Sequence, residues 1–152
     1  MTARSVIHSS FTLERTHDVP VDRVFAAWAD PAAKSRWFTG PDVEHSLDFR
    51  VGGLEIVRGH DADGAQMTFE SRYRDIVDGE RIAYTSTLSV GDALATASIT
   101  TVELRATATG TALLLTESAA FFDGREQPQW REHGTAAWLD ALTIELSRKA
   151  DS

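Results

Sequence analysis

Apolar and polar residues alternate with a period of two from residue 43 to about residue 122, in six segments separated by short turns. This alternation is typical of β-strands that turn one face toward a core. The sequence DADG at residues 61–64 and the pair Asp78-Gly79 favour tight turns, because glycine adopts the positive φ angles that such turns need. Consecutive strands joined by short turns predict an antiparallel meander. A further strand is predicted over residues 5–17, which makes seven.

Two short helices are predicted after the first strand, in the segment DVPVDRVFAAWADPAAKSRWF at residues 18–38. Asp18 is expected to cap the first helix, and Pro20 suits its first turn, where a missing N–H costs nothing. Asp30-Pro31 ends this helix and begins the second, since the residue before a proline avoids helical geometry. We expect the pair of helices to close one open end of a curved sheet.

A long helix is predicted in the final segment, PQWREHGTAAWLDALTIELSRK, beginning at Pro128. Apolar residues recur along it at helical spacing: Trp138, Leu142, Ile144 and Leu146. Arg148 and Lys149 are expected in its last turn, where they complement the helix dipole. Helices segregated from an antiparallel sheet define an α+β fold. A curved sheet around one long helix is not filled at its open end, so a pocket is expected there.

The composition limits the classes of function. The 152 residues, 42% hydrophobic and 25% charged, are expected to form one domain over residues 1–152. The absence of cysteine excludes disulfides, thiol catalysis and Cys-based zinc sites. A formal net charge of −8 argues against nucleic-acid binding and against docking on anionic membranes. No apolar run approaches the roughly 20 residues that cross a bilayer, and the first ten residues lack a signal-peptide segment, so a cytoplasmic location is expected.

Five segments, in order along the chain, carry a resemblance to a known family. They are RTHDVPVDRVFAAWADPAAKSRWF, LDFRVGG, SRYRDIVDGERIAYT, GTALLLTESAAFFDG, and the pattern G-x4-L-D-x-L-x3-L that starts at Gly134. Together they resemble the START-like, or SRPBCC, superfamily, and within it the branch of the activator of heat-shock-protein-90 ATPase. The resemblance implies a helix-grip fold: a curved antiparallel sheet of about seven strands wrapped around a long C-terminal helix, with two short helices after the first strand.

The final helix departs from the family pattern at one position. Thr135 stands where an aromatic residue usually follows the helix glycine, and Trp138 comes four residues after Gly134. Trp138 either refills the same space from the next helical turn or reshapes the pocket.

Most candidate site residues are aromatic or apolar. Such side chains either line a ligand cavity or pack directly in the core, and the sequence leaves both readings open. For the short helices the candidates are Trp28, Trp37 and Phe38; for the strands, Met67, Phe69, Tyr73 and Tyr84; for the final helix, Trp130 and Trp138.

The remaining two candidates are the charged residues Arg58 and Glu117. Arg58 and His60 share a strand face with Leu54 and Ile56. If that face points inward, Arg58 or His60 can orient a carboxylate or a phenol; if it points outward, both lie in solvent. Glu117 alternates with leucines in its strand, and a buried carboxylate needs a partner. It either pairs with Arg58 or lies at the cavity mouth.

The leading hypothesis is a binding module that holds a small hydrophobic molecule, aromatic, polyketide-like or lipid, between the sheet and the C-terminal helix. No metal and no cofactor are expected, because the histidines lack ligand spacing and no phosphate-binding motif is present. Superfamily relatives suggest two alternatives: a polyketide cyclase or aromatase, and a protein-interaction module like the chaperone activator. A homodimer that covers the sheet edges is also compatible with the sequence.

Overall fold

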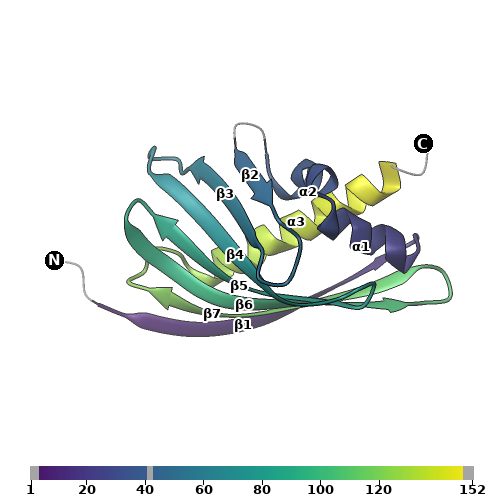
Figure 1. Ribbon diagram of the computed structural model, residues 1–152. Helices are drawn as coiled ribbons and strands as arrows, with labels where there is room; N and C mark the ends of the chain where they lie inside the picture. Colours follow the sequence, from purple (N-terminus) through teal and green to yellow (C-terminus); the bar gives the residue numbers. More distant parts are fainter. Residues whose placement is uncertain (1–3, 41–42, 149–152) are drawn as a thin grey trace.

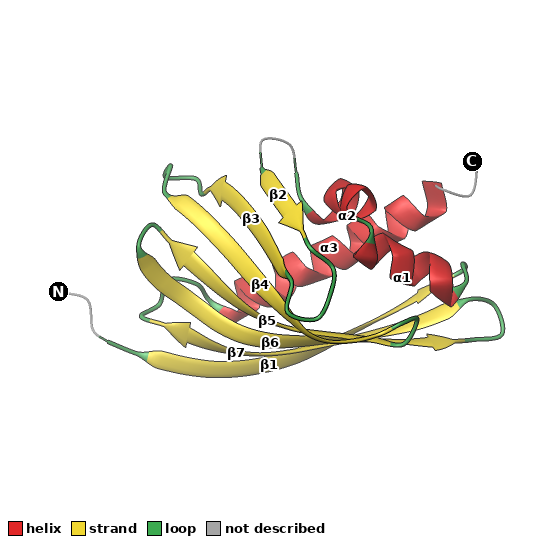
Figure 2. Cartoon of the chain, in the orientation of Figure 1, coloured by secondary structure: helices red, strands yellow, loops and turns green. Residues whose placement is uncertain are grey.

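Seven antiparallel strands form one strongly curved sheet that wraps around a C-terminal helix (Figures 1 and 2). The computed structural model describes residues 4–40 and 43–148. The sheet order is β1-β7-β6-β5-β4-β3-β2, so the last six strands form a meander and β1 pairs with β7. The α+β helix-grip prediction is confirmed. The strands are β1 (Val6–His17), β2 (Glu44–Leu47), β3 (Leu54–His60), β4 (Gln66–Val77), β5 (Arg81–Val90), β6 (Ala93–Ala106) and β7 (Thr111–Phe122).

The strand register decides which side chains face the helix. Tyr73 of β4 lies opposite Tyr84 of β5, Tyr84 opposite Thr100 of β6, and Thr100 opposite Glu117 of β7. All four side chains are buried. Because side chains alternate along a strand, this row fixes the inner face of four neighbouring strands. The alternation predicted for β4 and β5 is therefore confirmed.

The two short helices are α1 (Val21–Ala29) and α2 (Pro31–Phe38). The predicted capping role of Asp18 is wrong, because Pro20 occupies the N-cap position of α1 and no side chain caps this end. Asp30 does end α1 and begin α2: its Oδ2 accepts a hydrogen bond of 2.9 Å from the Ala33 N–H. Both helices lie over the C-terminal half of the long helix (Figure 1).

The long helix α3 (Pro128–Arg148) begins at the predicted proline. Its buried residues are Arg131, Thr135, Leu139, Leu142, Glu145 and Leu146. Ile144 was expected on the apolar face but is 64% exposed, so that expectation is wrong. Lys149 lies outside the described residues, and Arg148 does lie in the last turn. Among the described residues, no helix is both long enough and apolar enough to span a membrane.

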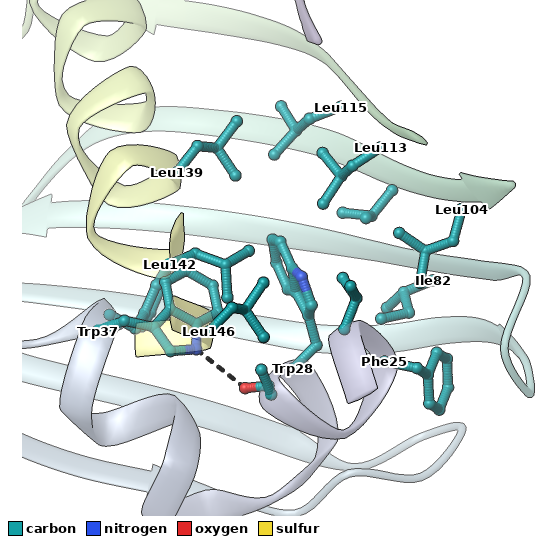
Figure 3. Close-up of a cluster of buried hydrophobic side chains, with 14 of the residues drawn as sticks. Phe25, Trp28, Trp37, Ile82, Leu104, Leu113, Leu115, Leu139, Leu142 and Leu146 are labelled. Atoms are coloured by element: carbon teal, nitrogen blue, oxygen red, sulfur yellow. Dashed lines mark hydrogen bonds between the residues drawn. The ribbon is translucent and has the colours of Figure 1, made fainter. Parts of the chain in front are cut away.

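The core lies between the short helices, the C-terminal half of α3 and the sheet (Figure 3). Trp28 and Trp37 pack edge to face in it, with ring centroids 4.8 Å apart. The Trp37 indole N–H donates a hydrogen bond of 2.9 Å to the Ala27 carbonyl, drawn as the dashed line in Figure 3. Of the two readings of these tryptophans, core packing is therefore the correct one. The helix pair closes this end of the sheet by filling it.

Candidate functional site

A cavity of about 460 Å³ opens at the other end of the molecule, between β3–β5 and the N-terminal half of α3. Its sheet wall is apolar, because Phe69 lies opposite both Val57 and Leu88, and Met67 lies opposite Val90. The lining is completed by Phe38 of α2, by Trp130, Arg131, Gly134, Thr135 and Trp138 of α3, and by Asp61, Arg125 and Glu126 in loops.

Aromatic side chains line the helix side of the cavity. The Trp138 ring lies 4.4 Å from Phe38 and 6.1 Å from Phe69, measured between centroids. Trp130 also lines the cavity and is 60% exposed, so it borders solvent. Trp138 lines the cavity one turn after Gly134, which is compatible with both alternatives: that it refills the space of the missing aromatic residue, or that it reshapes the pocket. Five predicted residues therefore lie together here: Phe38, Met67, Phe69, Trp130 and Trp138.

Arg131 is the buried cation of the cavity wall. Its Nη1 donates to Glu117 Oε2 over 2.8 Å, and its Nε donates to Glu126 Oε2 over 2.7 Å. Its Nη2 donates to the Thr96 hydroxyl, and Thr100 donates to the other Glu117 oxygen over 2.8 Å. We call these five residues the Arg131 cluster. Burial lowers the pKa of Arg131, but Glu117 and Glu126 outweigh it and raise that pKa, so the guanidinium stays charged.

Of the two readings of Arg58, the outward one is correct, and the pairing of Arg58 with Glu117 is wrong. The Arg58 side chain is 46% exposed on the outer face, 3.7 Å from Glu44, and Glu117 pairs with Arg131 instead. The reason is the register of β3: Glu55 lies opposite the buried Ser71, which puts the odd-numbered residues of β3 on the inner face. His60 shares the outer face and is exposed.

Tyr73 and Tyr84 were candidates for lining the cavity, but neither lines it. Tyr73 belongs to a second buried network, which we call the Lys34 cluster. The Lys34 ammonium lies 2.7 Å from Glu55 Oε1, and the Tyr73 hydroxyl donates to the same oxygen over 2.7 Å. His45 Nε2 lies 2.8 Å from Glu55 Oε2, and the Ser35 hydroxyl lies 2.6 Å from His45 Nδ1.

Aromatic rings enclose the ammonium of Lys34. The Nζ atom lies 4.3 Å from the Phe38 ring centroid and 5.2 Å from that of Trp28. Further rings within about 6 Å belong to Trp37, Tyr73 and Tyr84. Phe38 contacts the Lys34 ammonium and also lines the cavity. The Lys34 cluster therefore lies behind the aromatic wall of the cavity, and its Lys34, Glu55 and His45 side chains are closed to solvent.

Family membership follows from a match over most of the chain. The family described as Activator of Hsp90 ATPase homolog 1-like protein matches residues 18–147. The chain belongs to this family. The predicted resemblance is therefore confirmed.

Solved structures of similar proteins agree with this membership. The chain is 38% identical to an uncharacterized protein from Rhizobium leguminosarum, over 97% of this chain and 99% of that one, with a TM-score of 0.91. It is 44% identical to the Mll3558 protein from Rhizobium loti, over 93% and 99%, with a TM-score of 0.87. It is 28% identical to protein CV1439 from Chromobacterium violaceum, over 90% and 96%, with a TM-score of 0.76. No curated protein matches the chain.

In this member of the family, Lys34 and Glu55 form a buried ion pair. Burial alone would raise the pKa of the Glu55 carboxyl, but the Lys34 ammonium and the hydrogen bonds from His45 and Tyr73 lower it to about 2. Burial lowers the pKa of Lys34, and Glu55 opposes that effect. Burial and the nearby carboxylates raise the pKa of Tyr73 and of Tyr84. Both tyrosines are therefore neutral at physiological pH.

The low pKa of Glu55 predicts acid-sensitive stability. A carboxyl whose pKa falls from 4.5 in the unfolded chain to about 2 in the fold contributes stability that is complete above pH 4.5 and is lost as the pH falls toward 2. Between pH 6 and pH 3 this group should lose about 2 kcal/mol of its contribution. Carbon-13 NMR titration of the Glu55 carboxyl tests this directly: it should remain ionised at pH 3, and a midpoint near pH 4.5 would contradict the prediction.

Sequence reasoning missed Lys34, His45 and Glu55 as a group. One signal was available, because Lys34, Trp37 and Phe38 stand three and four residues apart and so share one helix face. That face is apolar, which should have marked Lys34 as a buried cation. Within residues 4–40 and 43–148, no three histidine, aspartate or glutamate side chains gather in a way that could hold a metal.

Proposed function

We propose that this protein binds a small hydrophobic molecule in the cavity between β3–β5 and α3, without transforming it. The observation that carries the proposal is the cavity itself: about 460 Å³, with apolar strand residues on one side and aromatic side chains on the other. Ligand pockets for small molecules have volumes of roughly 300–1,000 Å³ and mainly apolar walls with a few polar groups. Arg131 and Thr135 are polar groups on the helix side of this wall, and Asp61, Arg125 and Glu126 add polar groups from the loops.

The state of the acidic and basic groups supports binding over catalysis. Arg131 is held by Glu117 and Glu126, and Lys34 is held by Glu55. A general acid or base must reach the substrate and exchange protons with it. Groups committed to buried ion pairs are poorly suited to that exchange, so the cyclase alternative has no support from the geometry.

Gly134 offers a way to test the cavity without weakening the fold. It lies in α3 and lines the cavity, and a Cβ added there meets no atom within 4 Å. Gly134→Leu should therefore place its side chain in the space that a ligand would occupy. Replacing a helical glycine also stabilises the helix by about 0.5–1 kcal/mol, so the variant should melt no lower than the wild type.

The measurement is thermal unfolding with a panel of naphthols, flavonoids and long-chain alcohols. A ligand at a hundred times its Kd stabilises by about 2.7 kcal/mol, or roughly 5–10 °C for a chain of this length. Gly134→Leu should abolish that shift. Ala137→Leu is the matched control, because this position is exposed on the same helix and does not line the cavity. A shift that survives in Gly134→Leu would place the ligand elsewhere, and no shift for any compound would refute the proposal.

A further inference from the structure

We infer that the cavity selects an uncharged ligand with an oxygen acceptor, such as a carbonyl or phenol on an aromatic body, and rejects carboxylates. This inference rests on the proposed function and narrows it. It is carried by two properties of the wall: the unused donors of Arg131, and the balance of charge around that residue.

The Arg131 guanidinium has more N–H donors than the protein uses. A guanidinium carries five of them. Glu117, Glu126 and Thr96 account for three of them. Each guanidinium nitrogen thus has one acceptor, and within the described residues the second N–H of Nη1 and of Nη2 makes no further hydrogen bond, although the Arg131 side chain is only 6% exposed and lines the cavity. A buried donor without an acceptor is unfavourable. A ligand oxygen that accepts from Arg131 would therefore contribute favourably to the free energy of binding.

The charges around Arg131 determine whether the oxygen of the ligand should be neutral or anionic. The positive charge of Arg131 is already opposed by two carboxylates, those of Glu117 and Glu126. At the rim, Arg125 pairs with Asp123 over 3.0 Å, and Asp61 adds a further carboxylate to the lining. Three carboxylates are therefore paired with the two guanidinium groups, and Asp61 adds a fourth negative charge to the lining. A ligand carboxylate would meet net repulsion here, whereas a neutral carbonyl would receive the same hydrogen bonds without it.

The apolar and aromatic residues of the cavity wall indicate that the remainder of the ligand is aromatic. The Arg131 guanidinium carbon lies 5.7 Å from the Phe69 ring centroid, so the donors border the aromatic part of the cavity. Met67, Leu88 and Val90 extend the wall without any polar side chain. A flat aromatic body can thus contact the sheet wall and Trp138 while its oxygen reaches Arg131.

The test uses three probes with the same aromatic body: 2-acetonaphthone, 2-naphthoate and 2-ethylnaphthalene. Their dissociation constants are measured at pH 7 by titration of the intrinsic tryptophan fluorescence. The ketone should bind at least fivefold more tightly than the hydrocarbon, which lacks the acceptor, and more tightly than the carboxylate. A carboxylate that binds as well as the ketone, or a hydrocarbon that does, would overturn the inference and leave the proposed function standing. If none of the probes binds, both fail for this ligand class.

Glu126→Gln sharpens the test. Glutamine can still accept the hydrogen bond from Arg131 Nε, but it removes one negative charge from the lining. The naphthoate affinity should rise about fivefold and the ketone affinity should change less than twofold. Glu103→Gln removes the same charge at an exposed position seven residues along β6 from Thr96, and should change neither affinity. Equal responses of both probes to Glu126→Gln would contradict the charge argument.

Discussion

Replacing Glu55 with glutamine is expected to lower the free energy of unfolding by about 3–5 kcal/mol, because it leaves the Lys34 ammonium buried without a counter-charge. Lys34 is fully buried and Glu55 is 2% exposed, so solvent cannot compensate. His45 and Tyr73 would also lose the anion to which both are hydrogen-bonded. Urea unfolding at pH 7 measures the loss. It is large compared with the total stability of 5–15 kcal/mol that is usual for such a domain.

The double variant Lys34→Met/Glu55→Gln separates the loss of the charge pair from the loss of packing. Once no buried cation remains, at least half of the stability lost in Glu55→Gln should return. Glu44→Gln is the matched control, since Glu44 is an exposed acid on the neighbouring strand β2 and should change stability by less than about 0.5 kcal/mol. A loss below 1 kcal/mol in Glu55→Gln would show that the ion pair does not hold α2 against the sheet.

The fold was predictable because local pattern and turn chemistry agree. In β4 and β5 only one parity of residues is apolar enough to face a core, so the inner face could be assigned. In β3 the pattern misled, because Leu54 and Ile56 form an apolar outer face while Glu55 points inward. A carboxylate on an inner face contradicts simple alternation, and only the pairing with β4 reveals it.

The site was predictable only in its apolar part. Phe69 and Trp138 follow from strand and helix periodicity, and both line the cavity. The polar partners could not be found in this way, because Glu117 and Arg131 lie on different elements and meet only when α3 packs into the sheet. A salt bridge across elements depends on relative position and not on spacing, so the sequence offered Arg58 as a partner with equal justification.

The two ends of the space between the curved sheet and α3 therefore differ in structure. The end beneath α1 and α2 is filled by Trp28 and Trp37 and fixed by the Lys34 cluster, while the other end keeps open volume between Phe69 and α3. Rigid packing at one end holds α3 in place, which preserves the cavity at the other. The aromatic pair of Phe38 and Trp138 forms the boundary between them.

Arg131→Met is expected to destabilise the fold by about 3–5 kcal/mol, because it leaves the Glu117 carboxylate, which is 4% exposed, without its cation. Thr96 would lose its hydrogen bond to the guanidinium as well. Arg131→Met/Glu117→Gln should recover at least half of the loss in urea unfolding, since the more deeply buried of the two carboxylates is then no longer left unmatched and only Glu126, which is 13% exposed, has lost its cation. If the single variant is as stable as the wild type, the Arg131 cluster is not a structural element of the fold.

The same double variant links stability to ligand choice. It keeps the apolar walls of the cavity but removes the N–H donors and one of the two carboxylates that oppose them. We expect it to bind 2-acetonaphthone and 2-ethylnaphthalene equally well, so that the preference of the wild type for the ketone disappears while affinity for the hydrocarbon remains. A ketone preference that survives without Arg131 would mean that another donor, such as the Thr135 hydroxyl or the Trp130 N–H in the same lining, receives the ligand oxygen.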